Sequence, residues 1–402
     1  RNCLVGSEMC IRDRFRKMQV DSDKINNILR IAAEKRVPSI SAAVFSKQEK
    51  LFEGHFGFSN IENSVPVSKD SLFRIASMTK AITSSCIYQL IEKDILSLNT
   101  KLKEFFPEVA EKEILKGFKE NGDPILSKPT NDITIGNLLT HTSGFAYEIW
   151  NENIAKLVEK GDLQSAFANN DEFLKAPLVF DPGTNWEYGI GIDWLGVLIE
   201  KLNECSLQEY MQKNIFEPLG MENTSYDLEA KDHARVATVY GRNEDKYFEM
   251  PFEVPEKSNF YSGGGNLISN LDDYIKFLRV FLDYEKEEEN IILSSSSIKS
   301  MLTSFNEELL MRKMVTQVPM LSNNVDFFPE SSKSWSPGFM INHEDIKSGR
   351  PKDSAGWAGL FNSFFWVDPK NQISGLILMQ MLPFAEEGCF ETLQAFESSI
   401  YA

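Results

Sequence analysis

Segments with the pattern of β-strands lie near both ends of the chain. Close to the start, ISAAVFS (residues 40–46) and LFEGHFGF (51–58) are rich in apolar, β-branched and aromatic residues, and the polar KQEK between them is typical of a turn. Near the other end, GLFNSFFWVDP (359–369) and ISGLILMQM (373–381) form a second pair around Pro369, Lys370 and Asn371. Each end of the chain is therefore expected to contribute two strands.

The rest of the chain has helical spacing. Apolar residues from Ile25 to Ala33 follow N-cap candidates at 21–23, and this first helix should end before Pro38. A last helix is expected at 388–401. Helices are predicted in between at 82–96, 135–139, 192–203, 206–216 and 271–282.

Strands at both ends with helices between them predict an α/β (α+β) fold. Its antiparallel sheet is assembled from both chain ends, in a discontinuous domain made of residues 15–90 and 332–402. Residues 91–331 are expected to form a mainly helical insert, and the cleft should face this insert.

Composition narrows the class of partner. The chain has 402 residues, 42% of them hydrophobic, and a formal net charge of -17. Nucleic acid and anionic membrane are poor partners for such a chain, because phosphate binding needs clustered Lys and Arg. No apolar run approaches the roughly 18 residues of a membrane span. The expected partner is a small molecule, with no nucleic acid and no membrane.

The first fourteen residues, RNCLVGSEMCIRDR, match none of these patterns. LVGSEMCIRD resembles the translation of a sequencing-library adapter, so residues 1–14 are set aside from the fold, and a genuine basic leader is the alternative. Beyond them, Cys86, Cys205 and Cys389 suggest no disulfide framework. A cytoplasmic location is expected, with a signal segment lost upstream as the alternative.

The segment FRIASMTK places Ser77 three residues before Lys80, and Ser296 precedes Lys299 at the same spacing. The spacing alone does not distinguish the two pairs. Ser77, however, precedes an apolar helix, where free backbone N–H groups favour an oxyanion and where Lys80 lies one turn on. A buried lysine there would accept the serine proton. The alternative is an N-cap serine followed by a solvated lysine.

Other kinds of catalytic site find little support. The histidines are His55, His141, His233 and His343, and none accompanies a Gly-x-Ser-x-Gly motif. His141, in LLTHTSGF, is expected to be structural. No metal-binding spacing is present, and the run 263–265 is a glycine turn without a following Gly-Lys-Ser/Thr. We therefore expect no metal and no cofactor.

Several segments together carry a family resemblance. FRIASMTK, LLTHTSGF, PGTNWEYGIGIDWLG, IFEPLGM, SGGGNLIS and GWAGLFNSFFWVDP occur in the order seen in serine β-lactamase-like esterases. From about residue 20 onward the chain resembles that superfamily. It is similar to family VIII carboxylesterases and to fungal statin side-chain acyltransferases, which share a class C β-lactamase fold.

The resemblance implies a role for each matching residue. Ser77 would be the acylated nucleophile, Lys80 the first base and Tyr188 the second, although a core tyrosine is the alternative for Tyr188. Residues 357–359 match the third motif of the family. The backbone N–H of Leu360 would then face that of Ser77 as an oxyanion hole.

Two departures from β-lactamases favour esters. The Tyr-x-Asn motif is replaced by Tyr-Gly-Ile at 188–190, and the lysine of Lys-Thr-Gly is replaced by Trp357. A bulky apolar residue there suits an uncharged ester. Lys347, Ser348 and Gly349 match Lys-Ser-Gly by letter only, in a polar turn.

The expected substrate pocket contains mainly aromatic and small residues: Tyr147, Trp186, Tyr261, Trp357, Ala358 and Gly359. The sequence as a whole predicts a serine hydrolase that cleaves small to medium carboxylic esters through an acyl-enzyme on Ser77. The alternatives are an acyltransferase with the same residues, a β-lactamase or D-amino-acid peptidase, and an idle penicillin-recognising binding protein.

Overall fold

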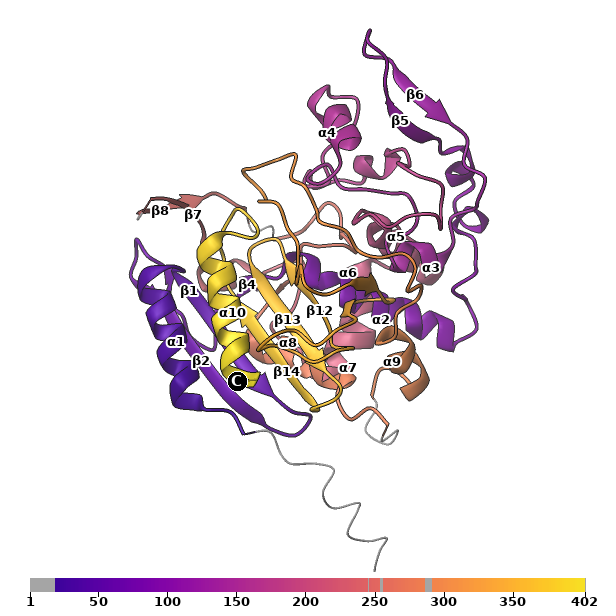
Figure 1. Ribbon diagram of the computed structural model, residues 1–402. Helices are drawn as coiled ribbons and strands as arrows, with labels where there is room; N and C mark the ends of the chain where they lie inside the picture. Colours follow the sequence, from indigo (N-terminus) through magenta and orange to yellow (C-terminus); the bar gives the residue numbers. More distant parts are fainter. Residues whose placement is uncertain (1–18, 245, 254–255, 286–290, 402) are drawn as a thin grey trace, which may run out of the picture.

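The main sheet joins the two ends of the chain. The structure, a computed structural model, describes residues 19–244, 246–253, 256–285 and 291–401, so that the segment 1–14 lies outside it. The sheet is antiparallel, in the order β10-β11-β12-β13-β14-β1-β2-β3 (Figure 1). Its strands are Ser39–Phe45 (β1), Lys50–Asn60 (β2), Val65–Pro66 (β3), Lys333–Trp335 (β10), Met340–Asn342 (β11), Ala355–Gly359 (β12), Ser363–Asp368 (β13) and Ile373–Leu378 (β14).

The junction between the two ends is the pairing of β1 with β14, in which Ser41 lies opposite Leu378. This pairing confirms the predicted antiparallel sheet. One predicted strand was wrong in its extent, because 359–369 is divided. Asn362 has a φ of 66° and its backbone N–H donates to the carbonyl of Gly359 at 3.0 Å, which makes a tight turn between β12 and β13.

Helices cover both faces of the sheet. Helices α1 (Ser22–Lys35) and α10 (Glu387–Tyr401) lie side by side on one face (Figure 1). Phe396 of α10 contacts Trp366, whereas Tyr274 of α8 (Leu271–Leu278) contacts the next residue toward the N-terminus, Phe365. Adjacent residues of a strand point to opposite faces. Helix α8, which falls within the range 91–331, therefore packs on the face opposite α1 and α10.

Helix α1 shows how the sequence positions these layers. The side chain of Asp21 accepts a hydrogen bond from the backbone N–H of Lys24 at 2.9 Å and caps the helix, as predicted. Ile25 and Leu29 are fully buried on its inner side. Burial of each such side chain contributes roughly 1.5–3 kcal/mol.

A helical region lies beside the sheet, with α2 at its centre. Every residue of α2 from Thr79 to Leu90 is buried, which is typical of a helix enclosed on all sides. The helices of this region are Thr79–Glu92 (α2), Ile135–Leu139 (α3), Glu152–Glu159 (α4), Gly191–Asn203 (α5), Leu207–Met211 (α6), Glu217–Leu219 (α7) and Ser295–Met301 (α9). The prediction for α2, 82–96, was wrong at both ends, whereas α3 agrees with its prediction.

Short strands outside the main sheet complete the fold. They are Phe73–Arg74 (β4), Ile114–Phe118 (β5), Pro124–Ser127 (β6), Val239–Asn243 (β7), Lys246–Met250 (β8) and Ile268–Ser269 (β9). The β5-β6 hairpin projects from one side of the molecule, and the β7-β8 hairpin lies on the other side, near α1 and α10 (Figure 1). Neither hairpin was predicted from the sequence.

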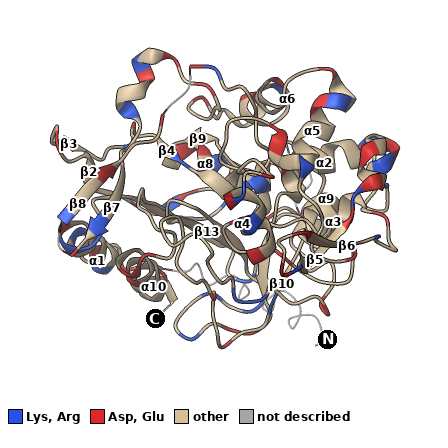
Figure 2. Ribbon diagram, turned by 90° about the horizontal axis from the view of Figure 1, so that it is seen from above, with Lys and Arg blue, Asp and Glu red and all other residues tan. Residues whose placement is uncertain are grey.

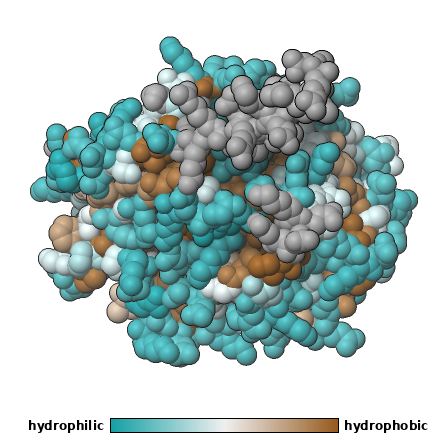
Figure 3. All heavy atoms as spheres, turned by 90° about the horizontal axis from the view of Figure 1, so that it is seen from below, coloured by the Kyte–Doolittle hydropathy of each residue, from teal (hydrophilic) through white to brown (hydrophobic). Residues whose placement is uncertain are grey.

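Charged side chains of both signs are distributed over the outer elements, and the sheet around β13 carries few (Figure 2). Seen from below, the surface is largely hydrophilic with separate hydrophobic areas (Figure 3). Within the described ranges, no helix combines the length and the apolar character needed to cross a bilayer.

Candidate active site

Ser77 lies at the entry to the buried helix α2, as the sequence predicted. It is the middle residue of a 3-10 turn, Ala76–Met78, that leads directly into α2, and its side chain is half-buried. Ala76 has a φ of 43°, a left-handed conformation that costs a non-glycine residue about 1–3 kcal/mol. The pairing of β4 with β9, with Phe73 opposite Ser269, anchors the chain just before this turn.

Lys80 lies one turn into α2 and points its amine at Ser77. The Nζ atom is 3.1 Å from the Oγ of Ser77 and 3.1 Å from the hydroxyl of Tyr147, and it donates to the carbonyl of Gly264 at 2.7 Å. The side chain is only 1% exposed. Burial lowers the pKa of Lys80 to about 7, and the charge of Asp193 opposes this shift only in part.

The hydrogen bonds around Lys80 fix the direction of its lone pair. The Tyr147 hydroxyl donates to Asp193 Oδ2 at 3.2 Å, so this hydroxyl acts as an acceptor toward Lys80. A neutral amine has two N–H groups, and the Gly264 carbonyl accepts the other one. The lone pair of neutral Lys80 is then left for the proton of Ser77.

Asp193 holds this network from α5. Its Oδ1 accepts from the Oγ of Ser262 at 2.5 Å and from the backbone N–H of Gly264 at 3.0 Å. A Cβ on Gly264 would lie 2.6 Å from Asp193 Oδ2 and 2.8 Å from the Tyr147 hydroxyl. Only glycine at 264 lets the backbone approach this closely, so the glycine turn predicted at 263–265 is part of the site.

Tyr188 lies beside both Ser77 and Lys80. Its hydroxyl accepts a hydrogen bond from the indole Nε1 of Trp357 at 3.0 Å, and Lys80 Nζ lies 4.8 Å from the centre of its ring. Burial raises the pKa of Tyr188, and hydrogen bonds with Ser77 and Trp357 act in the opposite direction. Tyr188 is therefore a neutral phenol at neutral pH, in contact with the nucleophile.

His141 packs against Tyr188 and hydrogen-bonds the backbone next to it. The residue has a φ of 57°, and its Nδ1 accepts from the backbone N–H of Gly189 at 3.3 Å. Its ring lies 4.6 Å from that of Tyr188, and burial holds its pKa well below the usual value. A neutral histidine fixed in a turn agrees with the structural role that the sequence indicated.

The end of β12 packs directly against the segment before Ser77. A Cβ on Gly359 would lie 2.4 Å from the carbonyl oxygen of Ile75, so the two backbones touch. Leu360, the residue after β12, lines the same cavity as Ser77. The predicted partners of an oxyanion hole thus lie at one site.

The cavity above Ser77, called the Ser77 cavity here, has a volume of about 390 Å³. Residues that line it include Ser77, Tyr147, Trp150, Phe252, Leu360 and Phe361. Its lining thus combines aromatic rings with polar and charged groups, Arg74, Asp193 and Glu253 among them, and its volume is within the usual range of small-molecule sites, roughly 300–1,000 Å³.

Of the residues predicted for the substrate pocket, Tyr147 lines this cavity. Trp357, Ala358 and Gly359 lie in β12, and the Trp357 indole contacts Tyr188. Trp186 is buried against His141 and Trp335, and the Tyr261 hydroxyl donates to Asp227 at 2.6 Å. These five residues are not among those that line the Ser77 cavity.

Three features of the site were not predicted from the sequence. They are Asp193, the carbonyl of Gly264 and the contact of Tyr147 with Lys80. A signal for Asp193 was available, because it is a carboxylate within the apolar helix GIDWLGVLI and is only 1% exposed. A buried charge in such a helix needs partners and indicates a functional site.

The other letter matches lie elsewhere. Ser296 and Lys299 are both exposed on α9. Lys347 and Ser348 are exposed in a turn before β12. Within the described residues, no cluster of three or more His, Cys, Asp or Glu side chains is suited to hold a metal ion.

The sheet of both chain ends, the helix-entry serine and the buried lysine define a protein of the β-lactamase and transpeptidase fold. The chain belongs to the beta-lactamase family, whose family model matches residues 24–398. The family resemblance inferred from the sequence is thereby confirmed.

Curated relatives include an esterase and several acyltransferases. A lovastatin esterase of Penicillium rubens is 28% identical, over 84% of this chain and 86% of the relative. A monacolin J acid methylbutanoyltransferase of Aspergillus terreus is also 28% identical, over 84% of this chain and 83% of the relative. Both are similar to this chain along most of their length.

Solved structures show the same fold. The unliganded simvastatin synthase of Aspergillus terreus superposes with a TM-score of 0.81 at 25% identity, covering 94% of this chain and 97% of the other. EstCE1, described as a hydrolase with promiscuous acyltransferase activity, has a TM-score of 0.75 at 17% identity, covering 94% of this chain and 98% of the other. The protein is thus an enzyme of the serine β-lactamase-like family, related to esterases and acyltransferases.

Proposed function

We propose that this enzyme is a carboxylesterase that cleaves small to medium esters through an acyl-enzyme on Ser77. The observation that carries the proposal is the buried Lys80 amine, with a pKa of about 7, 3.1 Å from the Oγ of Ser77. Such a lysine is neutral in a large fraction of molecules at neutral pH and replaces the histidine of other serine hydrolases.

The proposed acylation begins with the attack of Ser77 Oγ on the ester carbonyl while Lys80 takes the serine proton. The backbone N–H groups of Ser77 and Leu360 stabilise the resulting oxyanion. Tyr188 then gives its phenol proton to the leaving alkoxide, and the Lys80 ammonium returns a proton to the phenolate. The alcohol leaves, and the acyl group stays on Ser77.

Deacylation repeats these steps with water as the nucleophile. Tyr188 takes a proton from the attacking water as it passes its own phenol proton to Lys80, and Lys80 then returns that proton to the Ser77 Oγ as the acid departs. The proton count is balanced over one turnover. No cofactor takes part in the proposed reaction.

Acyl transfer to an alcohol is the second candidate, because an alcohol competes with water for the same acyl-enzyme. The names of the related methylbutanoyltransferase and of the hydrolase with acyltransferase activity favour it. The two candidates differ only in the acceptor. Product analysis with p-nitrophenyl butyrate and added butan-1-ol separates them, since a transferase forms butyl butyrate in preference to butyric acid.

The contacts of Trp357 argue against β-lactams. It replaces the lysine that helps β-lactamases hold the β-lactam carboxylate, and its indole packs on Tyr188. Ile190, where β-lactamases have an amide, is only 2% exposed. Slow turnover of nitrocefin compared with p-nitrophenyl acetate is therefore expected, and comparable rates would contradict this ranking.

The direct test is to measure the mass of the intact protein after treatment with a fluorophosphonate, which labels an active serine covalently. One adduct is expected on the parent protein and on Ser296→Ala, which alters the exposed serine of the second Ser-x-x-Lys pair. Ser77→Ala should carry none. An equal adduct on Ser77→Ala, or none on the parent protein, would overturn the proposal.

A further inference from the structure

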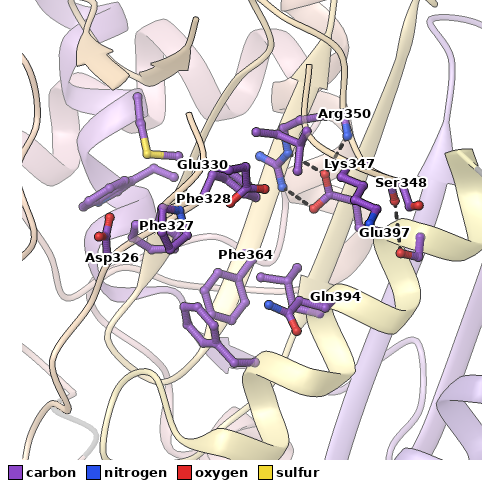
Figure 4. A pocket seen from close by; sticks show the side chains of 18 of the residues that line it. Asp326, Phe327, Phe328, Glu330, Lys347, Ser348, Arg350, Phe364, Gln394 and Glu397 are labelled. Atoms are coloured by element: carbon purple, nitrogen blue, oxygen red, sulfur yellow. Dashed lines mark hydrogen bonds and ion pairs between the residues drawn. The ribbon is translucent and has the colours of Figure 1, made fainter. Parts of the chain in front are cut away.

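A second cavity, called the α10 cavity here, lies between α10, the sheet and the loops 326–330 and 346–350 (Figure 4). Its volume is about 470 Å³, within the range of small-molecule sites, roughly 300–1,000 Å³. Over the described part of the chain, none of its lining residues lines the Ser77 cavity. The proposed reaction does not use this cavity.

The interior of the α10 cavity is apolar and aromatic. Phe327 and Phe328 contribute from one loop, Phe364 from β13, and Phe390 and Leu393 from α10. Figure 4 shows Gln394 reaching from α10 toward Phe364, and because Gln394 is exposed it marks the mouth of the cavity. A ligand gains free energy here mainly by removing apolar surface from water.

The charges around the cavity cancel. The Arg350 guanidinium makes two hydrogen bonds of 2.8 Å to the carboxylate of Glu397, and Lys333 lies 3.3 Å from Asp326. Glu330 and Lys347, one charge of each sign, remain at the rim. Lys333 does not itself line the cavity, but its pairing with Asp326 and that of Arg350 with Glu397 leave the inner lining without an unpaired charge, which favours an uncharged ligand over an anion or a cation.

Aromatic contacts connect this cavity to the candidate active site. The Phe390 ring lies 5.8 Å from that of Phe327, and the Phe327 ring lies 5.4 Å from that of Trp357, which also lines the cavity. Trp357 in turn donates its indole N–H to the Tyr188 hydroxyl at 3.0 Å. A molecule in the α10 cavity would thus touch the side chains that position Tyr188.

We propose that the α10 cavity binds an uncharged, largely apolar small molecule, and that its occupation raises turnover by holding Trp357 against Tyr188. This inference rests on the proposed function for its kinetic part. The binding part does not, because it is measured on protein that lacks the nucleophile.

Binding is tested with naphthalene, which has no group that can be acylated or hydrolysed. Saturation-transfer NMR on Ser77→Ala should show saturable binding, and adding Gln394→Trp, which fills the mouth, should abolish it. Glu391→Trp is the matched control, because Glu391 is exposed on the same helix but does not line the cavity. No saturable binding to Ser77→Ala, or equal binding with Gln394→Trp, overturns the proposal.

The kinetic test uses p-nitrophenyl acetate. Saturating naphthalene should raise kcat several-fold, with KM unchanged. Gln394→Trp should keep the basal rate and lose the response, and Trp357→Phe should still bind naphthalene without responding. A rise in KM alone, in the parent and Gln394→Trp alike, would place naphthalene in the Ser77 cavity and refute the inference. Failure of the fluorophosphonate test would instead refute the proposed function.

Discussion

The Lys80 amine lies 3.1 Å from the Ser77 hydroxyl in a position with almost no access to water. Because burial lowers its pKa to about 7, the unprotonated base accumulates as the pH rises through 7. We expect kcat/KM for p-nitrophenyl acetate to fall tenfold per unit below about pH 6 and to level off above pH 8. A profile without an acidic limb near 7 would exclude Lys80 as the base.

Replacing Lys80 by Met should leave a folded protein with little activity. The substitution removes the proton acceptor, and general bases typically contribute 10²–10⁴-fold to the rate. Because a fully buried amine is replaced by an apolar side chain of similar length, the melting temperature should not fall much. Lys299→Met is the matched control and should keep full activity.

Asp193→Asn should change the pH profile and the maximal rate in different ways. Removing a charge that raises the pKa of Lys80 moves the acidic limb to lower pH. The side-chain amide introduced at position 193 also donates a hydrogen bond to the Tyr147 hydroxyl. This hydroxyl then points its own proton toward the Lys80 lone pair, so that the lone pair is less available to Ser77 and kcat should fall.

The control for Asp193→Asn is a second buried carboxylate, Asp368, which accepts from the Tyr401 hydroxyl at 3.0 Å away from the site. Asp368→Asn should affect the melting temperature but not the pH profile. In a Tyr147→Phe background, Asp193→Asn should lower kcat by a smaller factor, because the Tyr147 hydroxyl that would turn toward Lys80 is absent. Additive losses would contradict the proposed orientation of Tyr147.

Two neighbouring glycines offer a steric test. Gly264→Ala would bring a Cβ to 2.6 Å from Asp193 Oδ2, whereas a Cβ on Gly265 would come no closer than 3.7 Å to its nearest neighbour, the Oγ of Ser262. Gly264→Ala should therefore cost about 1–3 kcal/mol of unfolding free energy and most of the activity. Gly265→Ala should be close to the parent in urea unfolding and in ester turnover.

The ends of the chain were the most predictable part of the fold. In α1 and in strands β1, β2 and β14, local pattern and tertiary environment agree, so residue spacing alone located them. The strand predicted at 359–369 failed because its first residues are apolar yet form the turn at Asn362. Apolar character reports burial, and a buried turn has the same composition as a buried strand.

The site was predictable only where its chemistry is local in sequence. Ser77 and Lys80 are one turn apart, and the entry to a helix can be read from the residues around them. The partners of Lys80 are distant, because Tyr147 and Gly264 follow it by 67 and 184 residues. A hydrogen bond to a backbone carbonyl leaves no trace in residue type, so the contact with Gly264 had no signal in the sequence.

The pairing of β1 with β14 also sets the order of events during synthesis. Ser77 emerges from the ribosome long before β12, whose following residue carries the other proposed half of the oxyanion hole. Before strands β12 to β14 appear, β1 lacks its neighbour in the sheet and exposes an apolar edge. The chain must therefore be made at least as far as β14 before this nucleophile becomes competent, and the unfinished chain is at risk of aggregation until then.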